Sequence, residues 1–236
     1  MIGIFINISL VFLFIRFFFV EIWKNYGKSQ MLSYFIFICY TGMLISLQFT
    51  YGQDVISKRC SYPYKQIDQF KLLLYILFPN LMIFMLMFAI LKILPGWKAP
   101  FSNTFGYFLA YTMGINKTFS SLLAKKGEND NINNSIDQIA GNKSLMINQF
   151  TVDNFAETFN EFHKNKLFFV EGYEPTNIPV EFVERINSVG QKEEIQKLFS
   201  AVSAKDLVAE HIWYILTGCL VITIVQNTMG ELNCNL

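Results

Sequence analysis

The chain has 236 residues, of which 53% are hydrophobic and 17% aromatic. This apolar share exceeds the roughly 45–50% that is typical of soluble domains, which indicates that lipid solvates part of the protein surface. The net charge is only +1, and the basic residues are dispersed, so no strong field would attract nucleic acid. Composition therefore excludes an ordinary soluble protein and argues against nucleic-acid binding.

Three apolar runs lie near the N-terminus, and we expect each to cross a membrane as a helix. They cover 2–20, 31–50 and 72–94, close to the roughly 20 residues that the hydrocarbon core of a bilayer requires. The first run lacks the basic leader and the cleavage site of a secretory signal. In the third run, Pro79 should bend the helix, and Asn80 is a candidate partner for a neighbouring helix.

Aromatic and charged residues mark the expected ends of the spans. Trp23 and Trp97 follow the first and third runs, and Trp213 stands at the start of a fourth. Tryptophan is enriched at membrane–water interfaces, so we interpret all three as interfacial anchors. Arg16 lies inside the first run, where we expect its guanidinium to extend toward the interface near Glu21 rather than to act as a buried functional charge.

The segment 96–123 follows the third run and is expected to form an interfacial or re-entrant helix. Its apolar stretch, Phe105–Ile115, has about half the length that a membrane crossing needs. Trp97 and Lys98 should anchor its entry. Apolar residues recur at helical spacing along it, namely Phe101, Phe105, Phe108, Leu109 and Met113.

The polar stretch 124–203 is expected to form a small extramembrane domain, rich in helix with one strand or hairpin. Its first part, Lys125–Ser135, has no apolar period and is interpreted as a flexible linker. The phenylalanines at 155, 159 and 162 should share one helix face, and Leu167–Glu171 is a strand candidate. Because the core of such a domain is thin, docking onto the membrane helices or onto a partner protein should stabilise it.

A last apolar run predicts a C-terminal transmembrane helix over 204–228, followed by a short tail over 229–236. The pattern Ser203-Ala204-Lys205-Asp206 resembles a helix cap at its start. The predicted fold class is therefore mainly α. It is a multi-pass transmembrane helical protein with about four spans and a small α-rich (α+β) extramembrane domain.

The predicted topology determines on which side of the membrane the cysteines lie. With four crossings, Cys60 and Cys234 lie on the face opposite the domain, where they could form a disulfide if that face is oxidising. Two free thiols are the alternative. A conflicting indication comes from glycosylation sequons on the domain face, which begin at Asn116, Asn133 and Asn142.

Residues that carry chemistry are sparse. The two histidines, His163 and His211, have no second His, Cys or acid at metal-ligand spacing, which argues against metal sites. The sequence has neither a phosphate-binding loop nor a nucleophile elbow. We therefore expect no enzymatic activity, no catalytic residues and no cofactor.

Two stretches of the sequence carry a resemblance to a known group of proteins. They read PGWKAPFSNTFGY at Pro95–Tyr107 and EHIWYILTGCLVITIVQNTMGELNC at Glu210–Cys234. Both are similar to membrane proteins of large eukaryotic DNA viruses, in which a bilayer underlies an icosahedral capsid. The resemblance implies a protein of the virion inner membrane that contacts minor capsid proteins.

The predicted function is that of a structural membrane protein whose domain docks to other proteins. Its expected partners are the lipid bilayer and further structural or membrane proteins within a larger assembly, but not nucleic acid. The alternative is an accessory subunit of an energy-transducing complex in the mitochondrial inner membrane, for which a Phe-rich composition is equally expected. A channel or transporter is less favoured, because no internal repeat is visible.

Overall fold

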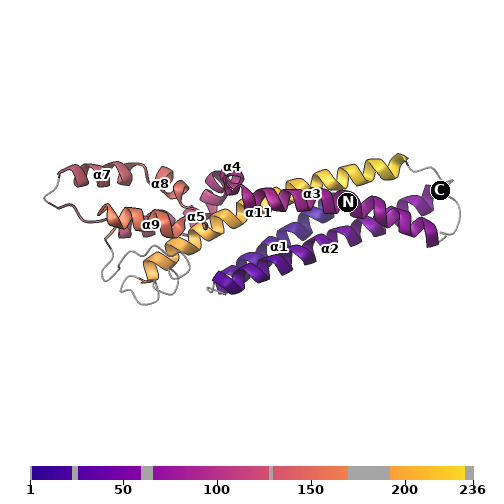
Figure 1. Cartoon of the computed structure of the whole chain (residues 1–236), viewed down its shortest axis with the longest axis horizontal. Coiled ribbons are helices and arrows are strands. Elements are labelled where there is room, and N and C mark those ends of the chain that lie inside the picture. Colours follow the sequence, from indigo (N-terminus) through magenta and orange to yellow (C-terminus); the bar gives the residue numbers. More distant parts are fainter. Residues whose placement is uncertain (1, 23–25, 60–65, 128–129, 170–191, 232–236) are drawn as a thin grey trace. The chain divides into compact units, whose positions relative to one another are not determined.

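The protein was studied as a computed structural model, in which the described chain is mainly helical (Figure 1). By its internal contacts the chain divides into two compact units. Unit 1 comprises Met1–Trp97 and Glu210–Leu236, and unit 2 comprises Lys98–Ala209. The structure describes residues 2–22, 26–59, 66–127, 130–169 and 192–231.

Unit 1 is built from long helices. They are α1 (Ile2–Ile22), α2 (Tyr26–Arg59), α3 (Gln66–Ile93) and the C-terminal part of α11 (Lys192–Glu231). Helix α2 continues to Arg59, beyond the end of the predicted run at Thr50. The extension is polar, and an i,i+4 ion pair supports it, with Lys58 Nζ 2.7 Å from an Asp54 carboxylate oxygen.

Three of the described helices are long and apolar enough to cross a membrane. The corresponding stretches are Tyr34–Lys58, Gln69–Ile93 and Glu193–Met229. The described part of α1 adds a shorter apolar helix, Ile2–Arg16, so a fourth crossing there stays a prediction. These helices indicate a membrane protein, as the sequence predicts.

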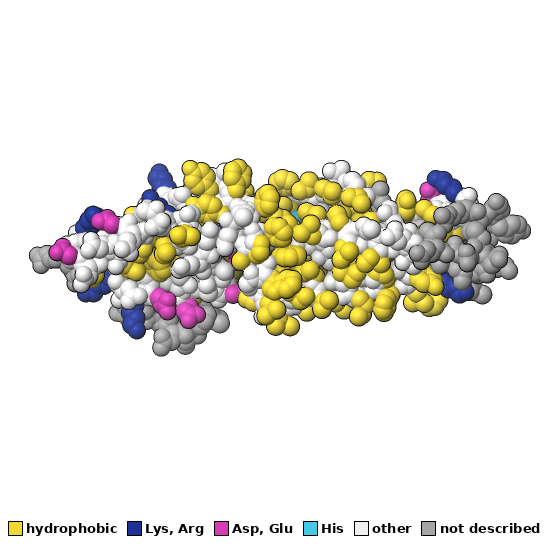
Figure 2. Space-filling model, turned by 90° about the horizontal axis from the view of Figure 1, so that it is seen from above, with side chains coloured by type: hydrophobic (Ala, Val, Ile, Leu, Met, Phe, Trp, Pro, Cys, Tyr) yellow, Lys and Arg dark blue, Asp and Glu magenta, His cyan; other side chains and the backbone are white. Residues whose placement is uncertain are grey.

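Hydrophobic side chains fill the interior of unit 1 and also cover its outside. Gly218 of α11 lies so close to α1 that a Cβ there would overlap the ring of Phe5. Figure 2 shows hydrophobic side chains gathered over these helices, with charged side chains sparse among them. Such a surface suits lipid rather than water. Its most exposed members include Phe14, Phe35, Ile38, Phe78, Met82, Met85 and Leu86.

Unit 2 consists of shorter helices and the N-terminal part of α11. Phe155, Phe159 and Phe162 are buried on one face of α9, as predicted, and pack with Phe168, whose ring centroid is 4.9 Å from that of Phe162. Edge-to-face and offset ring pairs of this kind favour a well-packed aromatic core. The helices are α4 (Ala99–Phe101), α5 (Tyr107–Thr112), α6 (Ile115–Leu122), α7 (Asp130–Gly141), α8 (Lys143–Gln149) and α9 (Phe155–Lys164).

The segment 96–123 is not one regular helix. A 3₁₀ turn, η1 (Pro95–Lys98), leads into α4, and a π-helical turn, η2 (Ser102–Gly106), joins α4 to α5. Gly114 then adopts a left-handed conformation with φ of 83°, which a glycine accepts without strain, and α6 starts directly after it. The interfacial or re-entrant position of this segment stays a prediction.

One local expectation in the polar domain was wrong, and a second one, the strand, stays a prediction because its end lies outside the described residues. The predicted linker ends at Asp130, where α7 starts, because Ile136 and Ile139 bury one face of that helix. Asn133 secures its first turn by accepting from and donating to the backbone of Gly127, at 2.9 and 2.8 Å. The strand candidate Leu167–Glu171 forms only an isolated bridge between Phe168 and Leu123 within the described residues.

Helix α11 does not begin at the predicted cap. It runs for 40 residues from Lys192 to Glu231, so the Ser203–Asp206 pattern lies in its interior. The apolar stripe that starts at Ile195 is buried in the core of unit 2, which keeps the helix intact ahead of this pattern. The carboxylate of Asp206 contacts other elements of unit 2 instead of capping its own helix.

Candidate functional site on helix α11

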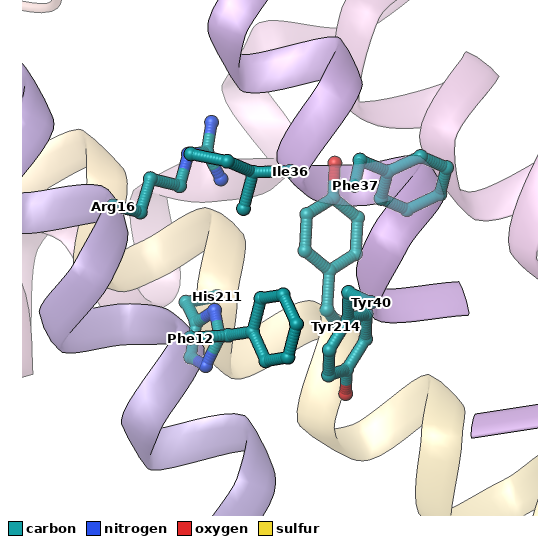
Figure 3. A pocket seen from close by; sticks show the side chains of 7 residues that line it. All are labelled: Phe12, Arg16, Ile36, Phe37, Tyr40, His211 and Tyr214. Atoms are coloured by element: carbon teal, nitrogen blue, oxygen red, sulfur yellow. The ribbon is translucent and has the colours of Figure 1, made fainter. Parts of the chain in front are cut away.

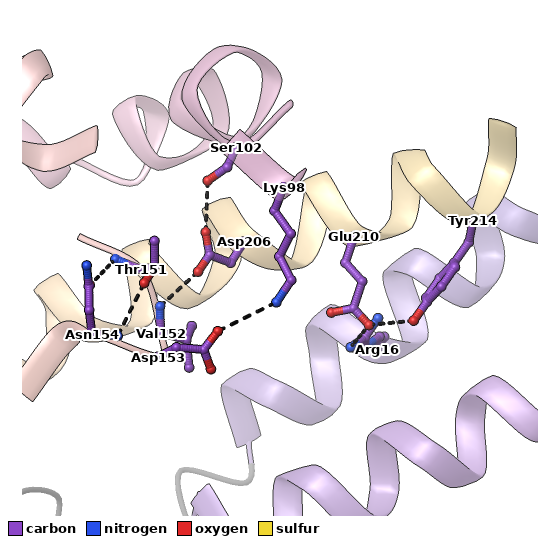
Figure 4. Close-up of polar contacts among 10 residues, drawn as sticks. All are labelled: Arg16, Lys98, Ser102, Thr151, Val152, Asp153, Asn154, Asp206, Glu210 and Tyr214. Atoms are coloured by element: carbon purple, nitrogen blue, oxygen red, sulfur yellow. Dashed lines mark hydrogen bonds and ion pairs between the residues drawn. The ribbon is translucent and has the colours of Figure 1, made fainter. Parts of the chain in front are cut away.

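The first polar cluster lies in the apolar interior of unit 1. Arg16 of α1 donates from Nη2 to Glu210 Oε1 of α11 at 3.0 Å, and the two side chains are only 11% and 10% exposed. Tyr214, one turn further along α11, donates its hydroxyl to the same oxygen at 2.8 Å (Figure 4). That Arg16 extends toward the membrane interface stays a prediction, and the structure adds an acid that pairs with it inside the bundle.

His211 belongs to a second set of contacts between α1, α2 and α11. Its Nε2 lies 2.6 Å from the carbonyl oxygen of Ser9, and because a carbonyl only accepts, the imidazole carries a proton on that nitrogen. The Ser9 and Tyr40 hydroxyls form a hydrogen bond of 2.9 Å. The ring centroids of Tyr40 and His211 are 6.2 Å apart.

A small hollow separates these two sets of contacts. Aromatic rings form much of its wall, and the Phe37 and Tyr214 ring centroids are 5.0 Å apart. Its volume is about 10 Å³, which is on the order of what one water molecule requires. It therefore cannot hold an organic substrate. Figure 3 shows the lining side chains, Phe12, Arg16, Ile36, Phe37, Tyr40, His211 and Tyr214.

A pair of amide side chains joins α2 to α3 elsewhere in unit 1. Asn80 donates from Nδ2 to Gln48 Oε1 at 2.7 Å and to the carbonyl of Ile76 at 2.8 Å. This confirms the prediction that Asn80, next to Pro79, serves as a partner for a neighbouring helix. Such interhelical hydrogen bonds between amides are typical of membrane helix pairs.

The polar cluster of unit 2 is centred on Asp206. One carboxylate oxygen accepts from the Ser102 hydroxyl and the other from the backbone N–H of Val152, both at 2.8 Å (Figure 4). Thr151 and Asn154 shape the turn that presents this N–H, because each backbone N–H donates to the other's side chain. Asp206 thereby ties three segments of unit 2 together.

The neighbouring Lys205 is fully buried and contacts the end of α8. Its Nζ lies 3.3 Å from the carbonyl oxygen of Ile147, a position in which a cation satisfies C-terminal helix carbonyls. Gly106 of η2 packs directly on the Lys205 backbone carbonyl, where a Cβ would overlap it. A separate ion pair lies at the exposed edge of this cluster, where Lys98 Nζ is 3.9 Å from a carboxylate oxygen of Asp153.

The structure describes only some of the predicted site residues. Trp97 and Trp213 lie together in unit 1, with ring centroids 5.8 Å apart and Trp213 Nε1 donating to the Trp97 carbonyl at 2.8 Å. Their role as interfacial anchors stays a prediction. Trp23, Cys60 and Cys234 lie outside the described residues, and so does the predicted disulfide.

The roles of the two carboxylates that organise these clusters, Glu210 and Asp206, were not predicted from the sequence. Asp206 was interpreted as part of a cap. The available signal was the presence of a base, Arg16, near the C-terminal end of the first apolar run and of an acid, Glu210, near the N-terminal end of the last one. Within the described residues, no group of three or more His, Cys, Asp or Glu side chains could hold a metal ion.

The fold and these clusters define the class of the protein as a helical membrane protein with a compact polar unit. No protein family, curated protein or solved structure matches the chain.

Proposed function

We propose that the chain is a structural integral membrane protein whose unit 2 docks to other proteins. The observation that carries this proposal is the dual membership of α11. Its N-terminal part contributes Ile195 and Leu198 to the core of unit 2, and its C-terminal part contributes Tyr214 and Val221 to the core of unit 1. A helix that is built into both cores is suited to holding a docking domain at a membrane.

The polar groups of unit 1 also support an anchoring role. In a low-dielectric interior, an ion pair is tolerated when both charges are compensated. Arg16 and Glu210 compensate each other there, and Tyr214 adds a hydrogen bond. These contacts fix α1 on α11, which is the requirement of a stable anchor.

The proposed location is the inner membrane of a virion, with minor capsid proteins as partners that link membrane and capsid layer. The resemblance of Pro95–Tyr107 and Glu210–Cys234 to viral membrane proteins supports this location. The alternative is an accessory subunit of a mitochondrial energy-transducing complex. Co-purification of the chain with haem or with quinone oxidoreductase activity would favour that alternative, and solute flux in proteoliposomes would favour a channel.

Extraction in mild detergent followed by lysine-reactive cross-linking and mass spectrometry tests the docking role. We expect cross-links from exposed lysines of unit 2, such as Lys164 and Lys166, to one partner recovered in constant proportion. Lys58 of unit 1 is equally exposed and serves as the control, because it should give few cross-links to that partner. A monodisperse monomer without any cross-linked partner would contradict the proposal.

A further inference from the structure

The turn η2 and helix α5 present an aromatic face on the surface of unit 2. Phe105, Phe108 and Tyr111 follow one another at intervals of three residues and are 63%, 70% and 58% exposed. The opposite face is buried through the small residues Gly106 and Ala110. Three large aromatic side chains in helical register therefore share one side of this element, and more than half of each is exposed.

Positive charge surrounds this face in the sequence. From Gln69 to Gly127 the chain contains no Asp or Glu, so its charged side chains there are all lysines. Lys117 in α6 and Lys125 after it are exposed. Interfacial helices that bind anionic lipid combine lysines with exposed aromatic residues, and this stretch of the sequence contains both. The same combination is unfavourable for docking to a basic protein.

The short connection between α3 and Phe105 limits how far this face can lie from the membrane. Helix α3, a candidate membrane span, ends at Ile93, and Phe105 follows 12 residues later. The connection is mostly helical, and a helix of this length extends only about 18 Å. Trp97, half-exposed on the way, belongs to the residue type that is enriched at membrane interfaces. The aromatic face is therefore within reach of the bilayer surface where α3 ends.

We propose that the face formed by Phe105, Phe108 and Tyr111 inserts into the interfacial region of the bilayer and prefers anionic lipid. The rings enter the boundary between headgroups and acyl chains, while lysines such as Lys117 and Lys125 attract acidic headgroups. This lipid contact goes beyond the proposed protein docking, because its partner is the membrane itself. It also determines which side of unit 2 is turned away from protein partners.

Site-directed spin labelling of the full chain in nanodiscs, with one chain per disc, tests this insertion. A nitroxide is attached at Phe108→Cys in a variant whose native cysteines are replaced by serine. Matched controls are Phe169→Cys and Leu145→Cys, since these apolar side chains of unit 2 are 62% and 61% exposed. We expect the label at 108 to collide severalfold more with oxygen, and severalfold less with a water-soluble nickel complex, than either control label.

The lipid composition then tests the charge preference. Adding phosphatidylserine to phosphatidylcholine discs should lower the nickel accessibility at position 108 severalfold, and high salt should reverse the effect because it screens charge. Replacing Lys117 and Lys125 together by glutamine should abolish this dependence on phosphatidylserine. A label at Tyr111→Cys repeats the measurement at a second position in case Phe108→Cys perturbs the fold.

Several outcomes would overturn the proposal. Equal nickel accessibility at position 108 and at the two control positions, in both lipid mixtures, would show that the face does not insert. Equal nickel accessibility at position 108 with and without phosphatidylserine would show that the face has no preference for anionic lipid. Protection at 108 that arises only in discs loaded with two chains would assign the face to contact with a second copy instead.

Discussion

Glu210 in unit 1 and Asp206 in unit 2 stand one turn apart on the same helix, yet their carboxylates are compensated in different ways. Glu210 pairs with a permanent cation, Arg16. Asp206 accepts from two neutral donors, the Ser102 hydroxyl and the Val152 amide. The ion pair joins the two apolar helices α1 and α11. The carboxylate of Asp206 instead joins α11 to two irregular segments of unit 2, at Ser102 and at Val152. The contrast predicts different consequences of removing a partner.

The largest effect should follow from Arg16→Met, which leaves Glu210 buried without its cation. Breaking a buried pair in this way costs about 3–5 kcal/mol, and we expect a corresponding fall in thermal stability in detergent. The double variant Arg16→Met with Glu210→Met removes both charges and should regain most of the loss. If the double variant is as unstable as the single one, the pair does not account for the stability of this contact.

A smaller loss is expected from Asp206→Ala, which removes an acceptor from Ser102 and from the Val152 amide. Hydrogen bonds to charged groups contribute about 1.5–3 kcal/mol each. Because neutral donors can bind water after the substitution, we expect each of the two hydrogen bonds to contribute near the lower end of this range, so that the total loss of stability is about 3 kcal/mol. Hydrogen exchange of the Val152 amide is the direct measurement and should accelerate. Unchanged exchange in Asp206→Ala would contradict the proposed role, and Asp153→Ala at the exposed edge of this cluster is the control.

The contact of Gly106 with α11 gives a third test within unit 2. In Gly106→Ala the new methyl group would overlap the backbone carbonyl of Lys205, which cannot move as a side chain does. Overpacking of this kind costs about 1–3 kcal/mol, measured as a lower unfolding midpoint of unit 2. Gly127→Ala is the matched control, because nothing lies near its Cβ position. Equal midpoints for the two variants would show that η2 is not packed as described.

The smallest effect should come from Tyr214→Phe in unit 1. This change removes one hydrogen bond to Glu210 but leaves the cation of Arg16 in place, so the loss should be about 1 kcal/mol. Tyr75→Phe, on the exposed surface of α3, is the control and should be neutral. If Tyr214→Phe were as costly as Arg16→Met, the hydroxyl rather than the cation would be the main partner of Glu210.

The features that sequence analysis predicted correctly are those that depend on local periodicity. The apolar stretches within α2, α3 and α11 were visible as long runs of the length of a membrane span. The face of α9 was visible because Phe155, Phe159 and Phe162 recur at helical spacing. Each of these patterns is contained within one element, so no knowledge of tertiary contacts was needed.

The errors concern features that depend on distant contacts. Helix α7 was missed because polar residues that individually favour turns, such as Asn133 and Asn134, separate its isoleucines, although these recur at helical spacing. The pairing of Arg16 with Glu210 joins residues 194 positions apart, and no local pattern contains it. The cap pattern at Ser203 was misleading, because Asp206 interacts with Ser102 and Val152 of other elements rather than with its own helix.

The separation of Arg16 and Glu210 along the chain also has a consequence for biosynthesis. At roughly 5–20 residues per second, the ribosome completes Glu210 on the order of 10–40 s after Arg16. During this interval the guanidinium has no carboxylate partner on α11, and water at the membrane boundary is its natural solvent. The buried pair of Arg16 with Glu210 therefore forms only after α11 has been synthesised.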